Sequence, residues 1–388
     1  MASANGVHGP SASTRRATLA ATFFAQGLLF IGLTTHLPQL KAMYGFTAAS
    51  LSFVMLGMVV LAGLGSVTAE QVARRRDSAV ALRVGLVLIA VGLACAGLLQ
   101  REWLFLGAIA VYGLGVGIVD ATGNMQAVAL EHLAERPILP SLHAAWTLGG
   151  IVATLVALSE GHVHIAWAFV PLVVAPVVAT AAPFIRRDHG EAATGTDLGG
   201  VPWRRIVLIG LALIVFYMVD TASSAWGPVF LNTTFGVSLD NVAVATMPYL
   251  VATLLARALG DRAVDRFGIV RPIQVGGVVS AVALAVIVFS PAAWVAVAGF
   301  AVLGLGIGIV APLSFSAAAA VAGDVTEPAA RRARVDAVIA RFNQFNYVGA
   351  LLGSVLTGLV GAGSLRVGFA LPMVLVLAII PLARSFRR

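Results

Sequence analysis

Long apolar runs are the feature that most constrains how this chain can fold. A helix needs about 20 mostly apolar residues to cross a bilayer, and such runs recur along almost the whole sequence. They are continuously apolar, whereas barrel strands alternate apolar and polar residues over about ten positions, so we expect helices. Twelve runs are long enough, and they lie near 17–39, 49–70, 78–99, 103–126, 139–159, 163–185, 204–231, 241–260, 270–290, 292–318, 336–361 and 366–384.

The composition agrees with an all-α integral membrane protein. Of the 388 residues 59% are hydrophobic and 11% are charged, against about 25% charged residues in an average soluble domain. A soluble enzyme, a disordered chain and a secreted disulfide scaffold are therefore excluded. The one cysteine, Cys95, leaves no intrachain disulfide or zinc site. We expect no metal and no cofactor, and the absence of Walker, GxSxG and HExxH motifs argues against an ATP-driven pump or an enzyme.

The positive residues predict the orientation in the membrane. With the N-terminus in the cytoplasm, 22 of the 25 Lys and Arg residues fall on the inner side, and only Lys41, Arg101 and Arg366 fall outside. Inner loops of membrane proteins are enriched in this way, so both termini are expected in the cytoplasm, in the cytoplasmic (inner) membrane. The net charge of +8 is then a topology signal that meets lipid headgroups, and no nucleic-acid partner is expected.

The two halves of the chain repeat each other at a fixed offset. Gly113–Val119 (GLGVGIV) matches Gly304–Val310 (GLGIGIV), 191 residues later. The other pairs at this offset are Glu70 with Asp261, Arg75 with Arg266, and Tyr44-Gly45 with Phe235-Gly236. Matches at separate places in one register indicate duplication, and two six-span halves that both start inside form a parallel repeat.

The longest polar interruption divides the chain between these halves. Residues 186–205 read RRDHGEAATGTDLGGVPWRR, which is typical of a linker. We therefore expect a cytoplasmic tail over 1–16, a six-helix bundle over 17–185, a cytoplasmic linker over 186–203 and a second six-helix bundle over 204–388.

Twelve spans in a 6+6 repeat with a central cytoplasmic loop resemble the major facilitator superfamily of transporters. A loop element of that superfamily is matched after the eighth span by Gly260-Asp261-Arg262 and Asp265-Arg266-Phe267-Gly268, while the copy after the second span lacks its Asp-Arg pair. The resemblance implies alternating access around a central cavity. It also implies a gating ion-pair latch, for which the residues here are Arg257, Asp261, Arg262 and Arg266.

A narrower likeness involves the fourth, fifth and seventh spans. Asp120 with Asn124, followed by Glu131, His143 and Gly149, resembles a bacterial subgroup near the fucose-permease branch. That subgroup tends to carry two acids in the seventh span, where this chain has Asp220 but Ala225 in the place of the second acid. The likeness implies a small polar, sugar-like substrate.

Asp120 and Asp220 are the two carboxylates that lie well inside predicted spans, one in each half. Ionisable groups are costly in a membrane and usually face a cavity or a partner, so we expect them to carry a coupling proton or to contact substrate. The resemblance puts spans one, four, seven and ten around the cavity, with the two acids facing each other. The alternative is a structural role, in which each carboxylate only accepts hydrogen bonds.

Further polar and aromatic residues within the spans are candidates for the cavity wall. Amides and aromatic rings suit hydroxyl-rich ligands, although such residues also simply join neighbouring helices in membranes. The candidates are Gln26, Asn124, His143, Trp146, Tyr217, Ser224, Trp226, Asn343, Asn346 and Tyr347.

The sequence thus predicts a monomeric secondary transporter that moves a small solute by alternating access, with proton symport as the favoured coupling. One alternative is an exporter of an amphipathic drug or metabolite, although the Gly-Pro pair usual in the fifth span of proton-antiporter exporters is absent. A non-transporting membrane sensor or scaffold is the alternative of another class. It is disfavoured because the chain has no sizeable soluble domain to relay a signal.

Overall fold

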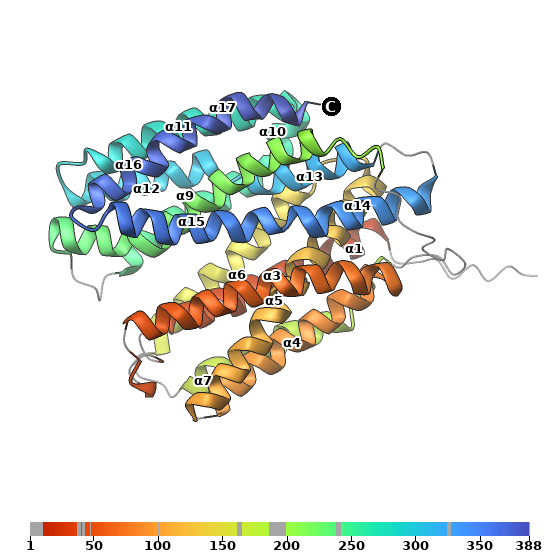
Figure 1. Cartoon of the computed structure of the whole chain (residues 1–388), viewed down its shortest axis with the longest axis horizontal. Helices are drawn as coiled ribbons and strands as arrows, with labels where there is room; N and C mark the ends of the chain where they lie inside the picture. The colour runs from red at the N-terminus through yellow and green to blue at the C-terminus, as the bar shows by residue number, and fades with distance from the viewer. Residues whose placement is uncertain are drawn as a thin grey trace, which may run out of the picture.

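A computed structural model of the chain describes residues 11–36, 40, 43–46, 48–99, 101–160, 165–185, 199–237, 242–323 and 327–387. Within these ranges every regular element is helical (Figure 1). The first half contains α1 (Ala12–Thr35), α3 (Ala48–Arg75), α4 (Ser78–Leu98), α5 (Glu102–Ala134), α6 (Leu139–Glu160), α7 (Ile165–Phe169), η1 (Pro171–Val173) and α8 (Val174–Thr180). The second half contains α9 (Trp203–Phe235), α10 (Val242–Phe267), α11 (Val270–Val288), α12 (Ala293–Ile307), α13 (Val310–Ala322), α14 (Pro328–Phe342), α15 (Gln344–Val360), α16 (Leu365–Leu375), η3 (Val376–Ala378), α17 (Ile379–Leu382) and η4 (Ala383–Phe386).

The predicted spans appear as helices, but the sixth, eighth and eleventh are not among the described segments that are long and apolar enough to cross a membrane. In the described ranges, nine helical segments are both long and apolar enough to cross a membrane. The sixth predicted span is broken around Pro171 into α7, η1 and α8, and the eleventh is divided at Asn343 into α14 and α15. The eighth, α10, continues to Phe267 through a charged last turn. The apolar part of α10 is therefore followed by charged residues within the same helix.

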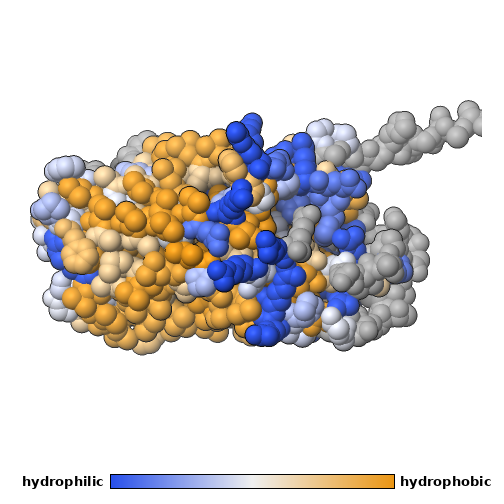
Figure 2. Space-filling model, turned by 90° about the horizontal axis from the view of Figure 1, so that it is seen from above, coloured by the Kyte–Doolittle hydropathy of each residue, from blue (hydrophilic) through white to orange (hydrophobic). Residues whose placement is uncertain are grey.

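The surface has the layered polarity of a multi-pass membrane protein. Figure 2 shows a broad apolar surface over most of the long axis and hydrophilic side chains gathered toward one end. We call this the arginine-rich end, and it is the end at which α14 lies in Figure 1. The helix ends that meet there, together with α14, carry the basic residues Arg15, Arg16, Arg74, Arg75, Arg76, Arg136, Arg204, Arg331, Arg332 and Arg334.

The helices of each half pack into one bundle, and the two bundles lie side by side (Figure 1). The first α-helix begins at Ala12, ahead of the apolar run expected from residue 17, and α9 begins at Trp203. Most of the expected linker, residues 186–198, lies outside the described residues, as do residues 1–10 of the expected tail. The contacts between the bundles include α6 on α10 and α14 on α3.

Glycines bring helix backbones together in the same way in both halves. A Cβ atom on Gly113 would lie 2.9 Å from the carbonyl oxygen of Met58, and one on Gly304 would lie 2.4 Å from that of Tyr249. Tyr249 follows Met58 by the same 191 residues that separate the two glycines. Glycines in a membrane helix can admit either a neighbouring backbone or a substrate. The close approach of α3 to α5 identifies helix packing as their role.

The tenth span departs from its counterpart because of a proline. Pro312 has no backbone N–H and cannot donate to the carbonyl of Gly308, four residues earlier, so the helix breaks between α12 and α13. The corresponding residue of the first half is Ala121, and α5 is continuous from Glu102 to Ala134. The break leaves the Gly308 carbonyl free to accept a side-chain donor.

Candidate functional site

Asp120, on α5, is held by donors from both halves of the molecule. One oxygen of its carboxylate accepts a hydrogen bond from the amide of Gln26, on α1. The other accepts one from the hydroxyl of Tyr347, on α15, at 3.0 Å. Gln26 is buried and Asp120 is half-buried. A single carboxylate therefore connects the first bundle to the second, deep in the spans.

The contact between Asp120 and Tyr347 extends into a buried amide network. Asn343, which separates α14 from α15, is fully buried, and its Nδ2 atom donates to the Tyr347 hydroxyl at 3.2 Å and to Ser66 Oγ at 3.4 Å. Ser66, on α3, donates in turn to the carbonyl of Ala340 at 3.1 Å. These bonds again join the two halves, since Ser66 belongs to the first and the others to the second.

Asp220, on α9, is bound within its own half. Its carboxylate accepts a hydrogen bond of 2.5 Å from the hydroxyl of Tyr249, on α10. Tyr249 is 2% exposed. Tyr249 is not among the residues that the sequence predicts for the site, because a tyrosine inside an apolar run resembles an ordinary core residue. Its spacing from Thr253 and Arg257, at four-residue steps along one face of α10, is the signal that could have found it.

Arg257 lies deep between the two halves, and α10 continues through Phe267, so the residues named for the gating loop are helical. The Arg257 side chain is 5% exposed. Its Nε atom donates to the free carbonyl of Gly308 at 3.0 Å, and Nη1 donates to Thr147 Oγ1 at 2.6 Å and to the His143 carbonyl at 3.5 Å. The charge pattern of the sequence puts Arg257 among the cytoplasmic positives, whereas the structure buries it as an interior cation next to Thr147 of the opposite half.

His143 and Asn124 lie between Asp120 and Arg257. The His143 Nε2 atom is 3.4 Å from Asn124 Oδ1, and Asn124 Nδ2 donates to the backbone carbonyl of Asp120 at 2.8 Å. The imidazole ring packs between Phe23, at 5.2 Å between ring centroids, and Phe315, at 6.3 Å. The predicted residues of α5 and α6 thus form one continuous polar path across the first half.

The remaining candidates divide between the centre and the helix packing. Tyr217 is half-buried one turn before Asp220 on α9 and packs its ring on Phe216, at 4.9 Å between centroids. Trp226 donates through Nε1 to the carbonyl of Ser354 at 2.9 Å, which fastens α9 to α15.

Trp146, Asn346 and Ser224 are placed more loosely. Trp146 is half-buried and packs its ring on Phe30, at 6.1 Å between centroids. Asn346 is half-buried one turn after Asn343 on α15. Ser224 is exposed, one turn after Asp220 on α9.

Two acids at the arginine-rich end join the halves in corresponding ways. Asp261, near the end of α10, accepts from Arg16 Nη2 at 2.9 Å and from the backbone N–H of Ser141, at the start of α6, at 3.1 Å. Glu70, its counterpart in the repeat, accepts from Arg341 of α14 at 3.2 and 3.3 Å. We call these two contacts the terminal latches.

Asp261 lies past the apolar part of α10, and burial raises its pKa, while the bonds from Ser141 and the charge of Arg16 act in the opposite direction. Arg262 and Arg266, the other residues of the predicted gating element, are exposed, and Arg266 lies over the ring of Phe267 at 5.4 Å. Among the described residues of that element, Arg257 and Asp261 are therefore the two that contact the opposite half.

Comparison with known proteins decides the family. The model of the Major Facilitator Superfamily matches residues 7–139 and 141–335. The chain belongs to the Major Facilitator Superfamily. It is therefore a multi-pass secondary transporter and not an enzyme, as the sequence predicted.

Relatives of this transporter cover nearly its full length. It is 28% identical over 377 residues to an uncharacterized MFS-type transporter of Yersinia pestis, with 94% of each chain covered. It is 27% identical over 364 residues to the uncharacterized transporter y4wD of Sinorhizobium fredii, with 90% of this chain and 92% of the relative covered. Membrane protein MosC of Rhizobium meliloti is 27% identical over 330 residues, with 81% and 78% covered.

Solved structures confirm the twelve-span, two-bundle fold of the transporter. The fucose:proton symporter FucP of E. coli superposes with a TM-score of 0.76 at 14% identity, over 98% of this chain and all of that one (100%). The human organic anion transporter MFSD10 superposes with a TM-score of 0.79, also at 14% identity, over 96% and 100%. At this identity the likeness concerns the fold alone, so the likeness to the fucose-permease branch is structural.

Proposed function

We propose that this transporter couples the movement of a small polar solute to protons, and that Asp120 carries the coupling proton. The observation that supports the proposal is the bond from Tyr347 of one half to the Asp120 carboxylate of the other. A hydrogen bond to an ionised carboxylate is roughly twice as strong as one to a neutral acid. Protonation of Asp120 then weakens the bond from Tyr347 and so favours separation of the two halves at this contact.

The same principle gives the proton a role in alternating access. Secondary transporters of this architecture rock two bundles around a site near the middle of the membrane. In the ionised state the contact from Tyr347 to Asp120 holds the bundles together, while Gln26 binds the carboxylate within the first half. Release of the proton on the other side of the membrane restores the contact with Tyr347 and resets the cycle.

A sugar-like solute is the substrate class that we favour. Hydroxyl groups are matched by amides that donate and accept and by aromatic rings that stack on the apolar face of a sugar ring. The residues that carry this inference are Gln26, Asn343, Tyr347, Tyr217 and Trp146. The shared fold with a fucose:proton symporter agrees with it. Export of an amphipathic compound is the alternative direction of transport, and a non-transporting sensor is the alternative of another class.

An anionic solute is a second candidate, favoured by one observation. Arg257 is a buried cation between the bundles, and a guanidinium group pairs well with a carboxylate. A solute that carries a carboxylate would reach this group beside Asp220 and Tyr217. An organic acid would then be preferred to a neutral sugar.

The placement in the cell follows from the charge distribution. We infer that the arginine-rich end faces the cytoplasm, with both termini inside, because inner loops are the positive ones. The transporter then lies in the cytoplasmic membrane as two units, 17–185 and 204–388, joined by residues 186–203. We infer that the monomer, with small-molecule substrate, protons and lipids as its partners, is the working unit.

The experiment is a thermal-shift screen followed by uptake. Purified protein is heated with sugars, organic acids and drugs at two pH values, because a ligand that binds the folded state raises the melting temperature by mass action. Each hit is then measured as uptake into proteoliposomes with and without an inward proton gradient. Gradient-stimulated uptake of a hit supports the proposal. A hit that moves equally well without the gradient contradicts coupling, and a protein that binds hits but moves none supports the sensor.

A further inference from the structure

A hollow at the arginine-rich end is not explained by the transport site. It has a volume of about 420 Å³ and lies between α1, α5 and the connection from α5 to α6. Its lining includes Arg16, Ala17 and Ala20 of α1, Leu130 of α5, and Arg136 and Ile138 of the connection. The hollow is separate from Asp120, Asp220 and Arg257, none of which lines it.

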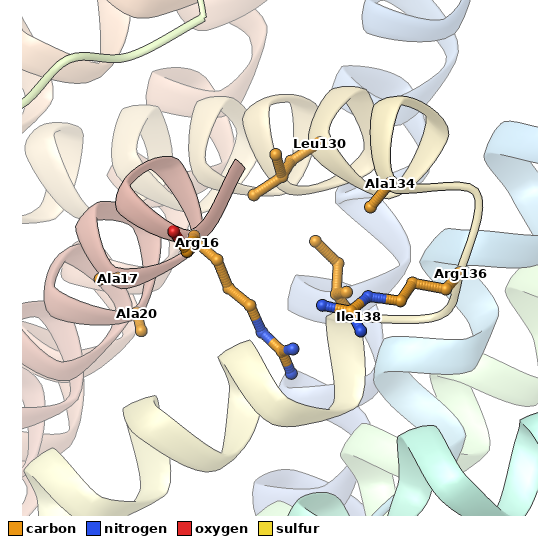
Figure 3. Close-up of a pocket in the computed structure, with 8 residues that line it drawn as sticks. Arg16, Ala17, Ala20, Leu130, Ala134, Arg136 and Ile138 are labelled. Carbon is orange, nitrogen blue, oxygen red and sulfur yellow. The ribbon is translucent and has the colours of Figure 1, made fainter. Parts of the chain in front are cut away.

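Two guanidinium groups and an apolar wall define the chemistry of the hollow. Figure 3 shows the side chains of Arg16 and Arg136 directed into the space between α1 and Ile138 from opposite sides. Arg136 is held there because α5 ends at Ala134 and Glu135 turns the chain with φ 51. The remaining lining is mostly alanine, leucine and isoleucine. A ligand that fits therefore has an anionic group next to an apolar part.

The position of the hollow in the membrane identifies the source of such a ligand. Apolar spans begin at Ser13 in α1 and end at Ala134 in α5, and both of these residues line the hollow. It therefore lies at the boundary between the apolar belt and the polar end, which is the level of the lipid headgroups. Ala17 is exposed and Ala20 half-buried on the apolar side of the hollow, where the start of an acyl chain would lie.

We propose that this hollow binds an acidic phospholipid, with the phosphate held between Arg16 and Arg136 and the proximal acyl chain against Ala17 and Ala20. Arginine pairs with phosphate through two parallel N–H donors. Basic pockets between spans at the cytoplasmic side are a known type of headgroup site in membrane proteins. A single exposed arginine would bind such a lipid only weakly, so the convergence of two is what makes this a site.

The bound phosphate would also reach one of the terminal latches. Arg16 uses its Nη2 atom both for Ser141 Oγ, at 2.7 Å, and for Asp261 Oδ2, at 2.9 Å. A phosphate in the hollow competes with Asp261 for this guanidinium. An acidic lipid then loosens the contact between α1 and α10, a consequence that rests on the proposed rocking of the two bundles, whereas the binding itself does not.

Binding is tested with a photoactivatable phosphatidylglycerol on the full-length protein in nanodiscs. After illumination the crosslinked peptides are located by mass spectrometry, and adducts are expected in α1 and in the α5–α6 connection. Arg136→Gln should lower labelling there about fivefold, since one basic residue near an acidic membrane surface contributes about 1 kcal/mol. Arg76→Gln is the matched control, because Arg76 is exposed at the same end and outside the hollow. It should leave labelling unchanged.

The competitors distinguish the sources of the phosphate. Unlabelled phosphatidylglycerol should suppress the labelling, while phosphatidylcholine and inorganic phosphate should not. Equal labelling of the Arg136→Gln variant and the unmodified protein, or suppression by inorganic phosphate alone, would overturn the proposal. Arg136→Lys keeps the charge without the forked donor and should restore part of the labelling. If Arg136→Gln does not fold, this variant and the competitors still decide the result.

The effect on the latch has a separate readout. Spin labels at Arg76→Cys and Arg204→Cys, in a Cys95→Ala background, report the distance between the two halves at the arginine-rich end. In the spin-labelled protein that is otherwise unchanged, phosphatidylglycerol should raise the population of longer distances. In the spin-labelled protein that also carries Arg136→Gln, it should not. Photolabelling of the hollow without this change in distance would overturn the proposed competition for Arg16 but would still support the binding site. Loss of labelling would overturn the site without bearing on transport.

Discussion

Asp120 and Asp220 are both carboxylates within the spans, but their partners differ. Asp120 accepts hydrogen bonds from Gln26 of its own half and from Tyr347 of the other half. Asp220 accepts its bond from Tyr249, in its own half. A group whose partners belong to both bundles responds to their relative position, whereas a group bound within one bundle does not. We therefore assign proton coupling to Asp120, and to Asp220 the role of holding α9 against α10 within the second bundle.

The largest effect is expected from Asp120→Asn. Asparagine keeps the shape of aspartate and can still accept a hydrogen bond, but it cannot take up a proton. Uptake driven by a proton gradient should fall at least tenfold (about 1.4 kcal/mol in an activation barrier), while exchange of solute across the membrane continues. Both activities are measured in proteoliposomes with a solute identified by thermal shift. Gradient-driven uptake that survives in this variant would remove Asp120 from the coupling step.

Asp220→Asn should act mainly on stability. The variant weakens a hydrogen bond to an ionised group, a contact worth about 1.5–3 kcal/mol, and removes a negative charge that interacts with the buried Arg257. We expect a lower melting temperature with the pH profile of uptake preserved. The melting temperature is followed by differential scanning fluorimetry and the profile by uptake at several pH values. A flat pH profile in Asp220→Asn, together with a normal one in Asp120→Asn, would reverse the assignment.

The two tyrosines sharpen the comparison further. Tyr347→Phe removes the hydroxyl that joins the halves, and Tyr249→Phe removes its analogue within one half. Because one such bond contributes about 1 kcal/mol, Tyr347→Phe should shift the equilibrium between conformations about fivefold, and Tyr249→Phe should shift it little. Distances between spin labels at Arg76→Cys and Arg204→Cys measure the shift. Equal shifts in both variants would mean that the bond from Tyr347 does not hold the halves together.

The smallest effect is expected at a terminal latch. Arg341 is 45% exposed in its side chain where it pairs with Glu70, and exposed ion pairs contribute about 0–1 kcal/mol. Arg341→Gln should therefore change the same distance distribution by no more than about fivefold, less at high salt than at low salt. A larger, salt-independent change would show that the latch, rather than Asp120, dominates the contact between the halves.

The spans and the duplication could be predicted because they depend on local patterns. Apolar length identifies a spanning helix wherever it occurs, and the glycine pattern at Gly113 and Gly304 recurs because each segment packs on the corresponding span of its own half, α3 or α10. Asp120 could be found because a charge is conspicuous in an apolar run. Pro312 alone indicates the break between α12 and α13. It lies inside a continuous apolar run, however, and that run predicts one unbroken span.

The partners of these groups could not be predicted in the same way. A hydrogen bond depends on the depth and rotation of two helices that are distant in sequence, as in the bond between Asp220 and Tyr249. Arg257 was assigned to the cytoplasmic side because charged residues follow it closely, yet the helix continues and buries it against Thr147. Its partner, the Gly308 carbonyl, is free only because Pro312 lies one turn later. Such features require the assembled bundles.

The central claim is that protonation of Asp120 releases the second bundle from the first. It is tested most directly by the distance between spin labels at Arg76→Cys and Arg204→Cys, measured from about pH 8 to about pH 5, a range in which a buried carboxylate can titrate. The account predicts that longer distances gain population as the pH falls. It also predicts that the long-distance population of Asp120→Asn stays high at every pH. The distance distribution of Asp220→Asn should respond to pH as that of the spin-labelled protein with both acids intact does. A distance distribution in Asp120→Asn that still follows pH would contradict the account.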